Sequence, residues 1–288
     1  MKVLVTGAEG MLGSDLCDLF QISDIDVVPM PRVSLDIQDL AKVKQVITSE
    51  RPHCVIHTAA ITNVDECERD PNLAHSINTV GTWNIALACR KVDSILVYIS
   101  SCGVFDGTKG EPYTEIDSPA PRTHYHKSKY LGERIVADLC KDYFIIRPGW
   151  LFGGKASHRR NFVEARRREA IAKPKIVSAK DKFGSPTYTA DLAKQILNLI
   201  ESEAFGLYHV ANVGFASRYE YVKKIVELLG VKTEVFPVGS DAFPRPAPVP
   251  AWEALDNFYL KLRNLNQMRS WESSIEDYII NRLLPEVG

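Results

Sequence analysis

The chain has 288 residues, of which 45% are hydrophobic and 25% are charged, and its formal net charge is −1. This composition is typical of a globular protein, and the near-zero charge gives no electrostatic attraction to nucleic acid or to an anionic membrane surface. No apolar run approaches the roughly 20 residues that span a bilayer, and we expect no signal peptide because the sequence begins directly with a strand pattern.

The first thirteen residues have the pattern of a nucleotide-binding turn. Residues 2–6 indicate a buried strand, the glycines of G-x-x-G-x-x-G follow at Gly7, Gly10 and Gly13, and an amphipathic helical pattern comes next. A strand, a turn and a helix in this order present backbone N–H groups and a helix N-terminus to a pyrophosphate. We expect Gly7 to allow the tight turn, Gly10 to admit the phosphates and Gly13 to let the helix pack on the sheet. The alternative is a glycine-rich turn without a ligand, and the flanking strand and helix favour the nucleotide site.

Strand and helix patterns then alternate through the first half of the chain. Strands are predicted at 25–28, 54–57, 94–101 and 143–147, and helices at 39–50, 71–91 and 125–140. Strands that are separated by helices form a parallel sheet through right-handed crossovers. The expected fold is therefore α/β, a doubly wound parallel sheet with helices on both faces.

The pattern is less regular after about residue 151. Residues 243–250 carry proline at every second position, which predicts an extended segment, and a last amphipathic helix is expected at 274–284. We predict a dinucleotide-binding domain at 1–150 and a smaller C-terminal substrate lobe at 151–288. Parts of 165–215 are expected to return to the sheet.

The six cysteines are scattered without a C-x-x-C pair. This spacing argues against a zinc ribbon and against a disulfide framework, and no group of His, Cys and Asp has metal-site spacing. We expect a reduced, cytoplasmic protein without a catalytic metal.

Three residues carry the predicted chemistry. Tyr125 and Lys129 are four residues apart on an expected helix and so share one face, and Ser101 ends the fourth strand, where the ligand crevice of such a sheet lies. A neighbouring ammonium lowers the pKa of a phenol, and a serine hydroxyl stabilises charge that develops on a carbonyl oxygen. We expect a nicotinamide to supply hydride while Tyr125 delivers the proton. Tyr219 and Lys223 have the same spacing, but they lie far outside the nucleotide fold and indicate a solvated helix face.

Longer segments have more specific sequences. Residues 59–68 follow A-A-x-T-x-V-D-x-A-E and residues 125–133 follow Y-G-x-T-K-x-x-G-E, while 104–115, 161–162 and 206–209 also carry motifs. Together they resemble the dTDP-4-dehydrorhamnose reductases, a family of extended short-chain dehydrogenase/reductases, over nearly the whole chain. The resemblance implies a Rossmann-type fold and NADPH- or NADH-dependent reduction of the 4-keto group of a nucleotide-linked 6-deoxysugar, the last step to dTDP-L-rhamnose.

Several segments depart from that family. Its Ser-Thr-Asp-Tyr-Val-Phe is Ser-Ser-Cys-Gly-Val-Phe at 100–105, so Ser101 replaces a threonine, and a carboxylate and a phenol are lost. Its Arg-Thr-Ser-Trp is Arg-Pro-Gly-Trp at 147–150, which is closer to sugar-nucleotide epimerases. Its Pro-Ala-Arg-Arg-Pro is Pro-Ala-Pro-Val-Pro at 246–250, and the Asn-Ser that follows is Trp252-Glu253. Arginine is a natural partner of a diphosphate, and Arg245, Arg159 and Arg160 are the candidates to replace the lost pair.

The end of the second strand bears on the cofactor. An NAD enzyme usually has an acidic residue there, whereas residues 28–32 read Val-Pro-Met-Pro-Arg. Arg32 favours the 2′-phosphate of NADP, with NAD as the alternative, unless it is a plain surface arginine. Asp36 and Ile37 are expected near the adenine, although Asp36 equally fits a helix cap. The expected cofactor contacts are Gly7, Gly10, Met11, Leu12, Arg32, Asp36, Ile37, Ala59, Ala60, Tyr125 and Lys129.

The expected substrate contacts are Cys102, Val104, Trp150, Asn161 and Arg245. Trp150 suits stacking on a sugar or base and equally suits a core position. Asn78 lies where the family has an active-site asparagine, and it also suits a helix kink. His57 is expected to be a core residue with its hydrogen bonds satisfied.

Two further functions stay open. One is an epimerase or dehydratase of the same superfamily, which the sequence at 147–150 favours. The other is a non-catalytic NADP-binding regulatory subunit, against which the retained Ser101, Tyr125 and Lys129 argue. The expected partner is a nucleotide-sugar substrate, with no nucleic acid and no membrane. The frequency of homodimers among soluble enzymes is the one argument for a homodimer.

Overall fold

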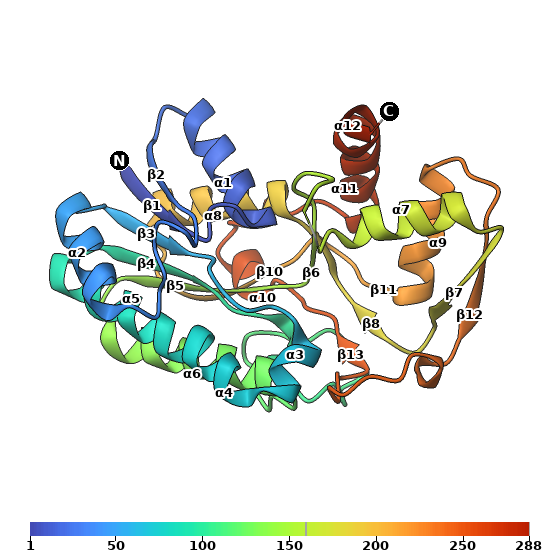
Figure 1. Cartoon of the computed structure of the whole chain (residues 1–288), viewed down its shortest axis with the longest axis horizontal. Helices are drawn as coiled ribbons and strands as arrows, with labels where there is room; N and C mark the ends of the chain where they lie inside the picture. Colours follow the sequence, from blue (N-terminus) through green and yellow to red (C-terminus); the bar gives the residue numbers. More distant parts are fainter. Residues whose placement is uncertain (159, 288) are drawn as a thin grey trace.

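A six-stranded parallel sheet forms the centre of the protein in the computed structural model, which describes residues 1–158 and 160–287. The strand order is β10-β5-β4-β3-β1-β2 (Figure 1). Its strands are β1 (Lys2–Thr6), β2 (Asp26–Met30), β3 (Cys54–His57), β4 (Ile95–Ile99), β5 (Tyr143–Pro148) and β10 (Gly206–Val210). The predicted doubly wound parallel sheet is confirmed.

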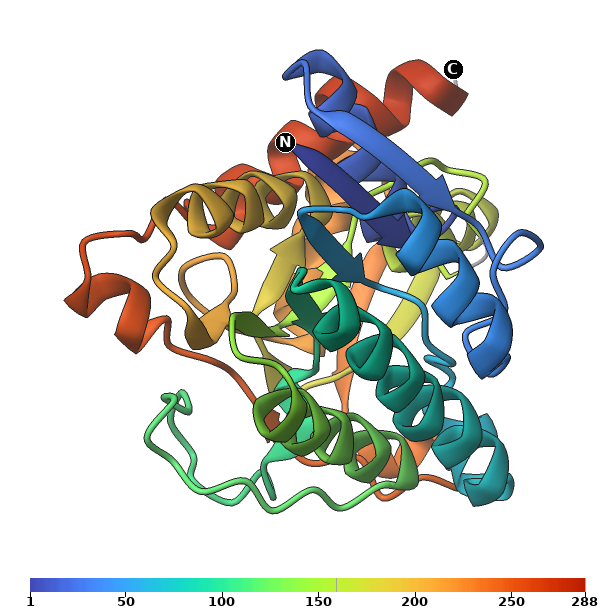
Figure 2. The same cartoon turned by 90° about the vertical axis from the view of Figure 1, so that its left-hand side faces the viewer.

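Helices cover both faces of this sheet. Helices α1 (Met11–Ile22) and α8 (Thr189–Ser202) lie on one face, and α2 (Leu40–Glu50), α5 (Gly81–Val92) and α6 (His124–Leu139) lie on the other. Figure 2 shows α5 and α6 running side by side. Side chains alternate along each strand, so that Val3 and Val5 face α1 while Leu4 faces α2. Burial on both faces explains why the inner strands β1, β3 and β4 are mostly apolar, whereas the edge strand β2 is partly exposed.

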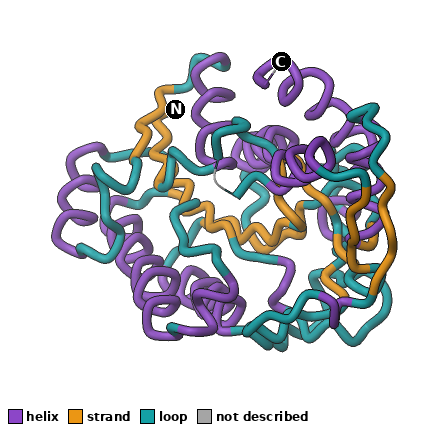
Figure 3. Tube along the Cα trace, turned by 45° about the vertical axis from the view of Figure 1, so that its right-hand side comes forward, coloured by secondary structure: helices purple, strands orange, loops and turns teal. Residues whose placement is uncertain are grey.

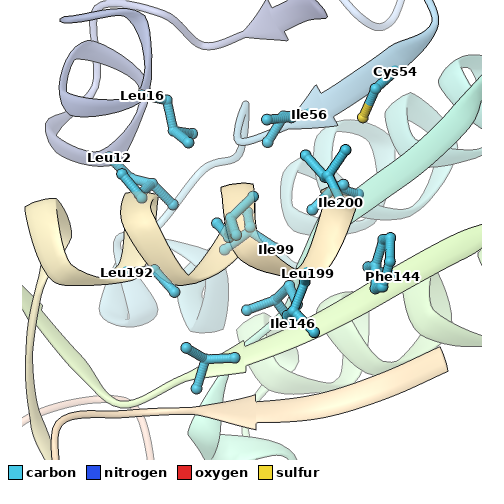
Figure 4. Packing of buried hydrophobic residues seen from close by; sticks show 14 of the residues in the cluster. Leu12, Leu16, Cys54, Ile56, Ile99, Phe144, Ile146, Leu192, Leu199 and Ile200 are labelled. Carbon is cyan, nitrogen blue, oxygen red and sulfur yellow. The ribbon is translucent and has the colours of Figure 1, made fainter. Parts of the chain in front are cut away.

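The core under α1 and α8 joins the two halves of the sequence. Leu12 and Leu16 of α1 pack with Leu192 and Leu199 of α8 over Ile146 of β5 (Figure 4). Each side chain of this kind contributes about 1.5–3 kcal/mol when it is fully buried. Polar contacts reinforce the packing, because Asp15 of α1 accepts a hydrogen bond from Thr189 at 2.5 Å and pairs with Arg282 at 2.6 Å.

The long helix expected at 71–91 is divided. Helix α4 (Pro71–Ala74) continues into a π-helical turn at His75–Val80 and then into α5, and a short helix α3 (Val64–Arg69) precedes it. A π-helical turn is rare and is often found at functional sites. Asn78 lies in this turn.

The second half contributes strand β10 to the central sheet and helix α8 to one of its faces, and it forms three smaller sheets. Figure 3 shows a separate group of strands, in orange, at the right-hand side of the view. The smaller strands are β6 (Trp150–Phe152), β7 (Lys175–Ala179), β8 (Phe183–Gly184), β9 (Pro186–Tyr188), β11 (Ala216–Ser217), β12 (Glu234–Val238) and β13 (Trp252–Glu253). The helices are α7 (Phe162–Ala172), α9 (Arg218–Leu228), α10 (Phe258–Leu262), α11 (Trp271–Tyr278) and α12 (Leu284–Val287), with a π-helical turn at Ile279–Leu283. The division into 1–150 and 151–288 stays a prediction.

Residues 243–250 form neither a helix nor a strand, as their prolines predict. Within the part of the chain that the structure describes, no helix is long and apolar enough to cross a membrane.

Candidate active site

The glycine-rich turn joins β1 to α1 at the carboxyl edge of the sheet. Gly7 has a φ of +67°, and a Cβ there would lie 2.8 Å from the backbone nitrogen of Ala59. A Cβ on Gly13 would lie 2.3 Å from the carbonyl oxygen of Gly7. The expected roles of Gly7 in the turn and of Gly13 in close packing are therefore confirmed, while the contact of Gly10 with phosphate stays a prediction.

The N-terminus of α1 is open. No side chain caps this helix at Gly10, whereas α2, α6, α7 and α9 are each capped by a side-chain oxygen. The first N–H groups of a helix have no acceptor within the helix, so this end can bind a pyrophosphate. Met11 is half-buried and Leu12 packs into the core, which leaves Leu12 only its backbone to offer a cofactor.

The segment after β3 lies against this turn. Thr58 donates a hydrogen bond from Oγ1 to the carbonyl of Thr6 at 2.6 Å, and the Ala59 N–H donates to Thr6 Oγ1 at 3.4 Å. Ala59 and Ala60 are half-buried beside Gly7. Both alanines therefore lie where a dinucleotide on the turn would extend.

The residues expected at the adenine end behave differently from one another. Arg32 is exposed in the turn after β2, and Asp36 is exposed with Oδ1 accepting from the Gln38 N–H at 3.0 Å. Asp39 caps α2, so the cap suggested for Asp36 is wrong. Ile37 is 4% exposed and packs against Gly81, which leaves its backbone as its only means of contact with a cofactor.

Helix α6 brings Tyr125 and Lys129 to one side. Thr123 caps the helix by accepting from the His126 N–H at 3.2 Å, which fixes the first turn. Strand β4 ends at Ile99, so Ser101 lies two residues beyond the strand rather than at its last position, and it accepts from the Gly103 N–H at 3.3 Å. Gly103 lies against the ring of His126, so the segment that carries Ser101 packs on the turn that carries Tyr125.

Lys129 is almost completely buried. Its ammonium lies 4.3 Å from the centroid of the Tyr98 ring, and the Tyr98 hydroxyl donates to the Lys129 carbonyl at 3.1 Å. Burial lowers the pKa of Lys129 to about 7, although Glu133 opposes this shift. Burial also raises the pKa of Tyr125. The expected lowering of the Tyr125 pKa by Lys129 is therefore outweighed by burial in the protein without cofactor. Tyr125 accordingly carries its proton at neutral pH.

A buried ion pair holds α6 on the sheet. Glu133 accepts from Arg147 of β5 at 2.8 and 2.7 Å, and from the Ser100 hydroxyl at 2.5 Å. Breaking such a pair by removing one partner costs about 3–5 kcal/mol. Arg147 therefore fixes the helix that carries Tyr125 and Lys129.

Two further polar residues, Asn78 and His57, are hydrogen-bonded to other residues of the protein. Asn78 accepts from the Ile61 N–H at 2.9 Å and donates to the Ile61 carbonyl and to Ser128 Oγ at 3.1 and 3.0 Å. It therefore ties the segment after β3 to α6, next to Lys129. His57 is hydrogen-bonded through both ring nitrogens to Thr6 and Thr82, and burial lowers its pKa to about 3. The prediction of His57 as a core residue is confirmed.

Two expected substrate contacts have partners within the protein, and their contact with a substrate stays a prediction. The side chain of Val104 is completely buried, and its carbonyl accepts from the Ala120 N–H at 2.8 Å. Asn161 caps α7 through Glu164 N–H and donates to the Tyr278 hydroxyl at 2.5 Å. Both residues are enclosed by core contacts. Cys102 is 5% exposed and stays beside Ser101, and burial raises the pKa of its thiol.

Trp150 and Arg245 also have partners within the protein. The Trp150 indole is buried, with its N–H donating to Glu253 at 3.0 Å, which supports the core alternative. Arg245 binds both oxygens of Asp65 at 3.0 and 3.1 Å and thereby holds residues 243–250 on α3. Its expected contact with the substrate stays a prediction.

For the other two candidate arginines, the contact with the substrate also stays a prediction. Arg160 donates to Thr62 Oγ1 at 2.5 Å, and Arg159 lies outside the described residues.

A polar group beside Cys102, formed by His126, Glu253 and Arg218 around Trp150, was not predicted from the sequence. His126 lies 3.8 Å from a Glu253 oxygen, Glu253 binds Trp150, and the guanidinium of Arg218 lies 3.4 Å from the centroid of the Trp150 indole. Two departures from the family pattern pointed to this group. His126 stands where the motif has glycine, and Glu253 replaces its serine.

In the described ranges, 1–158 and 160–287, no group of three or more His, Cys, Asp or Glu side chains is arranged to hold a metal ion.

Comparison with known proteins identifies the family. Residues 1–283 match the model of the RmlD substrate binding domain. The chain is 35% identical over 281 residues to the spore coat polysaccharide biosynthesis protein SpsK of Bacillus subtilis, covering 98% of both chains. It is 34% identical over 282 residues to the dTDP-4-dehydrorhamnose reductase of Mycolicibacterium smegmatis, covering 96% of this chain and 85% of that one.

A solved structure supports the same family assignment. The dTDP-4-dehydrorhamnose reductase of Bacillus anthracis, solved in complex with NADP, is 39% identical and superposes with a TM-score of 0.93 over 97% of this chain and 99% of that chain. The match covers the glycine turn, the Tyr125 helix and the second half together. The chain therefore belongs to the RmlD substrate-binding-domain family, which includes the dTDP-4-dehydrorhamnose reductases.

Proposed function

We propose that the protein is an NADP(H)-dependent reductase of the 4-keto group of a nucleotide-linked 6-deoxysugar, and that dTDP-4-dehydrorhamnose is its substrate. The observation that carries the proposal is the position of Tyr125 and Lys129 on α6, packed against the Ser101 segment at the same sheet edge as the uncapped glycine turn. The name and NADP complex of the Bacillus anthracis relative support the same cofactor here.

The residues present fit this cofactor. The uncapped first turn of α1 suits the pyrophosphate, and the exposed Arg32 suits a 2′-phosphate. Bound NADPH would supply the hydride. Ser101 would donate a hydrogen bond to the keto oxygen, and Tyr125, protonated at neutral pH, would transfer its proton to that oxygen. Lys129 lies one helical turn away, where its ammonium would stabilise the phenolate that remains.

The test is turnover of dTDP-4-dehydrorhamnose followed by NADPH absorbance. We expect one NADPH oxidised per sugar reduced. Tyr125→Phe should abolish turnover and leave NADPH affinity nearly unchanged, while Tyr219→Phe, in the decoy Tyr-x-x-x-Lys pair, should retain activity. Unchanged turnover in Tyr125→Phe would refute the mechanism.

Other outcomes would identify the alternatives. Product formed without net NADPH oxidation would indicate an epimerase, and NADPH binding without turnover of any nucleotide sugar would indicate a regulatory subunit.

A further inference from the structure

Arg218 has an unusual environment for an arginine. It is the first residue of α9, its guanidinium lies 3.4 Å from the centroid of the Trp150 indole, and Phe162 lies 4.9 Å away. Among the residues that the structure describes, none accepts a hydrogen bond from this guanidinium or forms an ion pair with it within 4.0 Å. Burial lowers the pKa of Arg218, and the nearby charge of Glu253 opposes this shift. Arg218 is half-buried, and its N–H groups, which have no acceptor among the described residues, are available to a ligand.

The other arginines near the crevice are already paired. Arg147 binds Glu133, Arg245 binds Asp65, and Arg160 binds Thr62. Glu253 does not neutralise Arg218 by direct contact, since its oxygens face the Trp150 N–H and His126. Among these arginines of the described residues, Arg218 has no hydrogen-bond or ion-pair partner, and the chain has lost the two arginines of the family loop at 248–249.

Arg218 also lies near the reacting groups. The Trp150 indole beneath Arg218 donates to Glu253, another oxygen of Glu253 lies 3.8 Å from His126, and the His126 ring centroid lies 5.0 Å from that of Tyr125. In a nucleotide-linked pyranose, C4 and the anomeric oxygen lie on opposite sides of the ring. A 4-keto group at Tyr125 therefore requires the diphosphate to lie about one sugar ring away from the Tyr125 hydroxyl.

We infer that Arg218 binds the diphosphate of the nucleotide-sugar substrate, with its fork of N–H groups donating to two phosphate oxygens. This inference rests on the proposed function. A guanidinium matches a phosphate with paired hydrogen bonds that an ammonium cannot reproduce. Stacking on Trp150 fixes the plane of the fork before substrate arrives, which reduces the entropy lost on binding.

The test is calorimetric binding of dTDP, UDP and thymidine to the NADP-loaded protein. Arg218→Met keeps an unbranched apolar stem over Trp150, removes the guanidinium and should weaken dTDP binding about 10- to 100-fold, the range of a lost charge-assisted bidentate contact. Thymidine affinity should not change, and Arg218→Lys should give an intermediate value. In turnover, KM for the sugar nucleotide should rise by the same factor while kcat changes little.

Arg166→Met is the matched control. Arg166 also lies over Phe162, at 5.5 Å, but it pairs with Glu169, so its removal should leave dTDP affinity unchanged. NADPH affinity and thermal unfolding report whether each variant is folded. If Arg218→Met does not fold, Arg218→Lys and Arg218→Gln repeat the comparison.

Three results would overturn the inference: dTDP affinity within twofold of wild type in Arg218→Met, an equal loss of thymidine affinity, or a wild-type protein that binds neither nucleoside diphosphate. The proposed function fails separately. A wild-type protein that binds dTDP through Arg218 but reduces no keto sugar would refute the reductase and retain the diphosphate site.

Discussion

The imidazole of His126 fills the space directly above Gly103, where an added Cβ would lie 2.1 Å from both Cε1 and Nε2 of the ring. The family motifs have tyrosine at position 103 and glycine at position 126, so in this chain the larger side chain stands on the other segment. The ring is held in place, since its Nδ1 lies 3.0 Å from Thr123 Oγ1. The two departures from the family pattern are therefore one coupled change.

Gly103→Ala should reduce the free energy of unfolding by about 1–3 kcal/mol, because the buried ring has to move. The same substitution should cost much less in a His126→Gly background, where the space is empty. Urea denaturation of the two single variants and the double variant gives the coupling energy. Additive effects would show that the two positions are independent.

The glycines of the first turn should separate folding from cofactor binding. Gly13→Ala should destabilise the fold, since its Cβ would meet the Gly7 carbonyl oxygen at 2.3 Å. At Gly10 the nearest atom to an added Cβ is 3.2 Å away, so Gly10→Ala should change stability by less than about 1 kcal/mol and weaken NADPH binding about tenfold. Thermal unfolding and fluorescence titration with NADPH measure the two effects. Equal loss of stability in both variants would contradict the assignment of Gly10 to phosphate binding.

Lys129 should make stability depend on pH. Its pKa falls from 10.5 to about 7 on folding, so between these values the unfolded chain binds a proton that the folded protein lacks. The free energy of unfolding therefore rises with pH across this window, and below about pH 7 the folded protein bears the full cost of a buried ammonium. Lys129→Met should be inactive but more stable than wild type at pH 6 by a few kcal/mol.

That stability difference should shrink by pH 9, as urea denaturation at the two pH values would measure. Lys127→Met, at an exposed position on the same helix, should show no such trend. A Lys129→Met protein that is less stable than wild type at both pH values would contradict the burial argument.

Arg32 should determine the choice of cofactor. Arg32→Ala should raise KM for NADPH about tenfold and leave KM for NADH nearly unchanged, because only NADPH has the 2′-phosphate. Steady-state kinetics with both cofactors measure the ratio. An unchanged ratio would mean that Arg32 is a plain surface residue.

Asp65 should control the 243–250 segment. It accepts from Arg245 and from the Ala247 N–H, and although partial burial opposes the shift, the hydrogen bond from Arg245 lowers the pKa of Asp65. The contact should therefore persist in mild acid. Asp65→Ala should speed proteolysis within 243–250 and leave NADPH affinity unchanged, as limited digestion and titration would measure. Wild-type resistance to protease would show that other contacts hold the segment.

The central sheet was predictable because its strands are continuous apolar runs with regular helical spacing. The strand predicted at 54–57 matches β3 residue for residue. The π-helical turn at His75–Val80 was not predictable, since the helical periodicity continues through it. Strands such as β8 and β11 are two residues long and are defined by pairing with distant segments rather than by any local pattern.

In the candidate site, too, contacts between residues that are close in the sequence were predictable and contacts between distant residues were not. Tyr125 and Lys129 share one helix, and their spacing alone puts them together. Arg245 and Asp65 are 180 residues apart, so no local pattern could predict the hydrogen bonds between them. Asn161 similarly meets Tyr278 from 117 residues away.

The packing of α8 on α1, with β10 beside β5, also determines how the polypeptide can be cut. A fragment that stopped at residue 150 would leave β5 as a bare sheet border and would strip the cover from Leu12 and Leu16. Such a piece is expected to aggregate, because an unpaired apolar border recruits other chains. During synthesis, α1 is therefore fully covered only after α8 has been made.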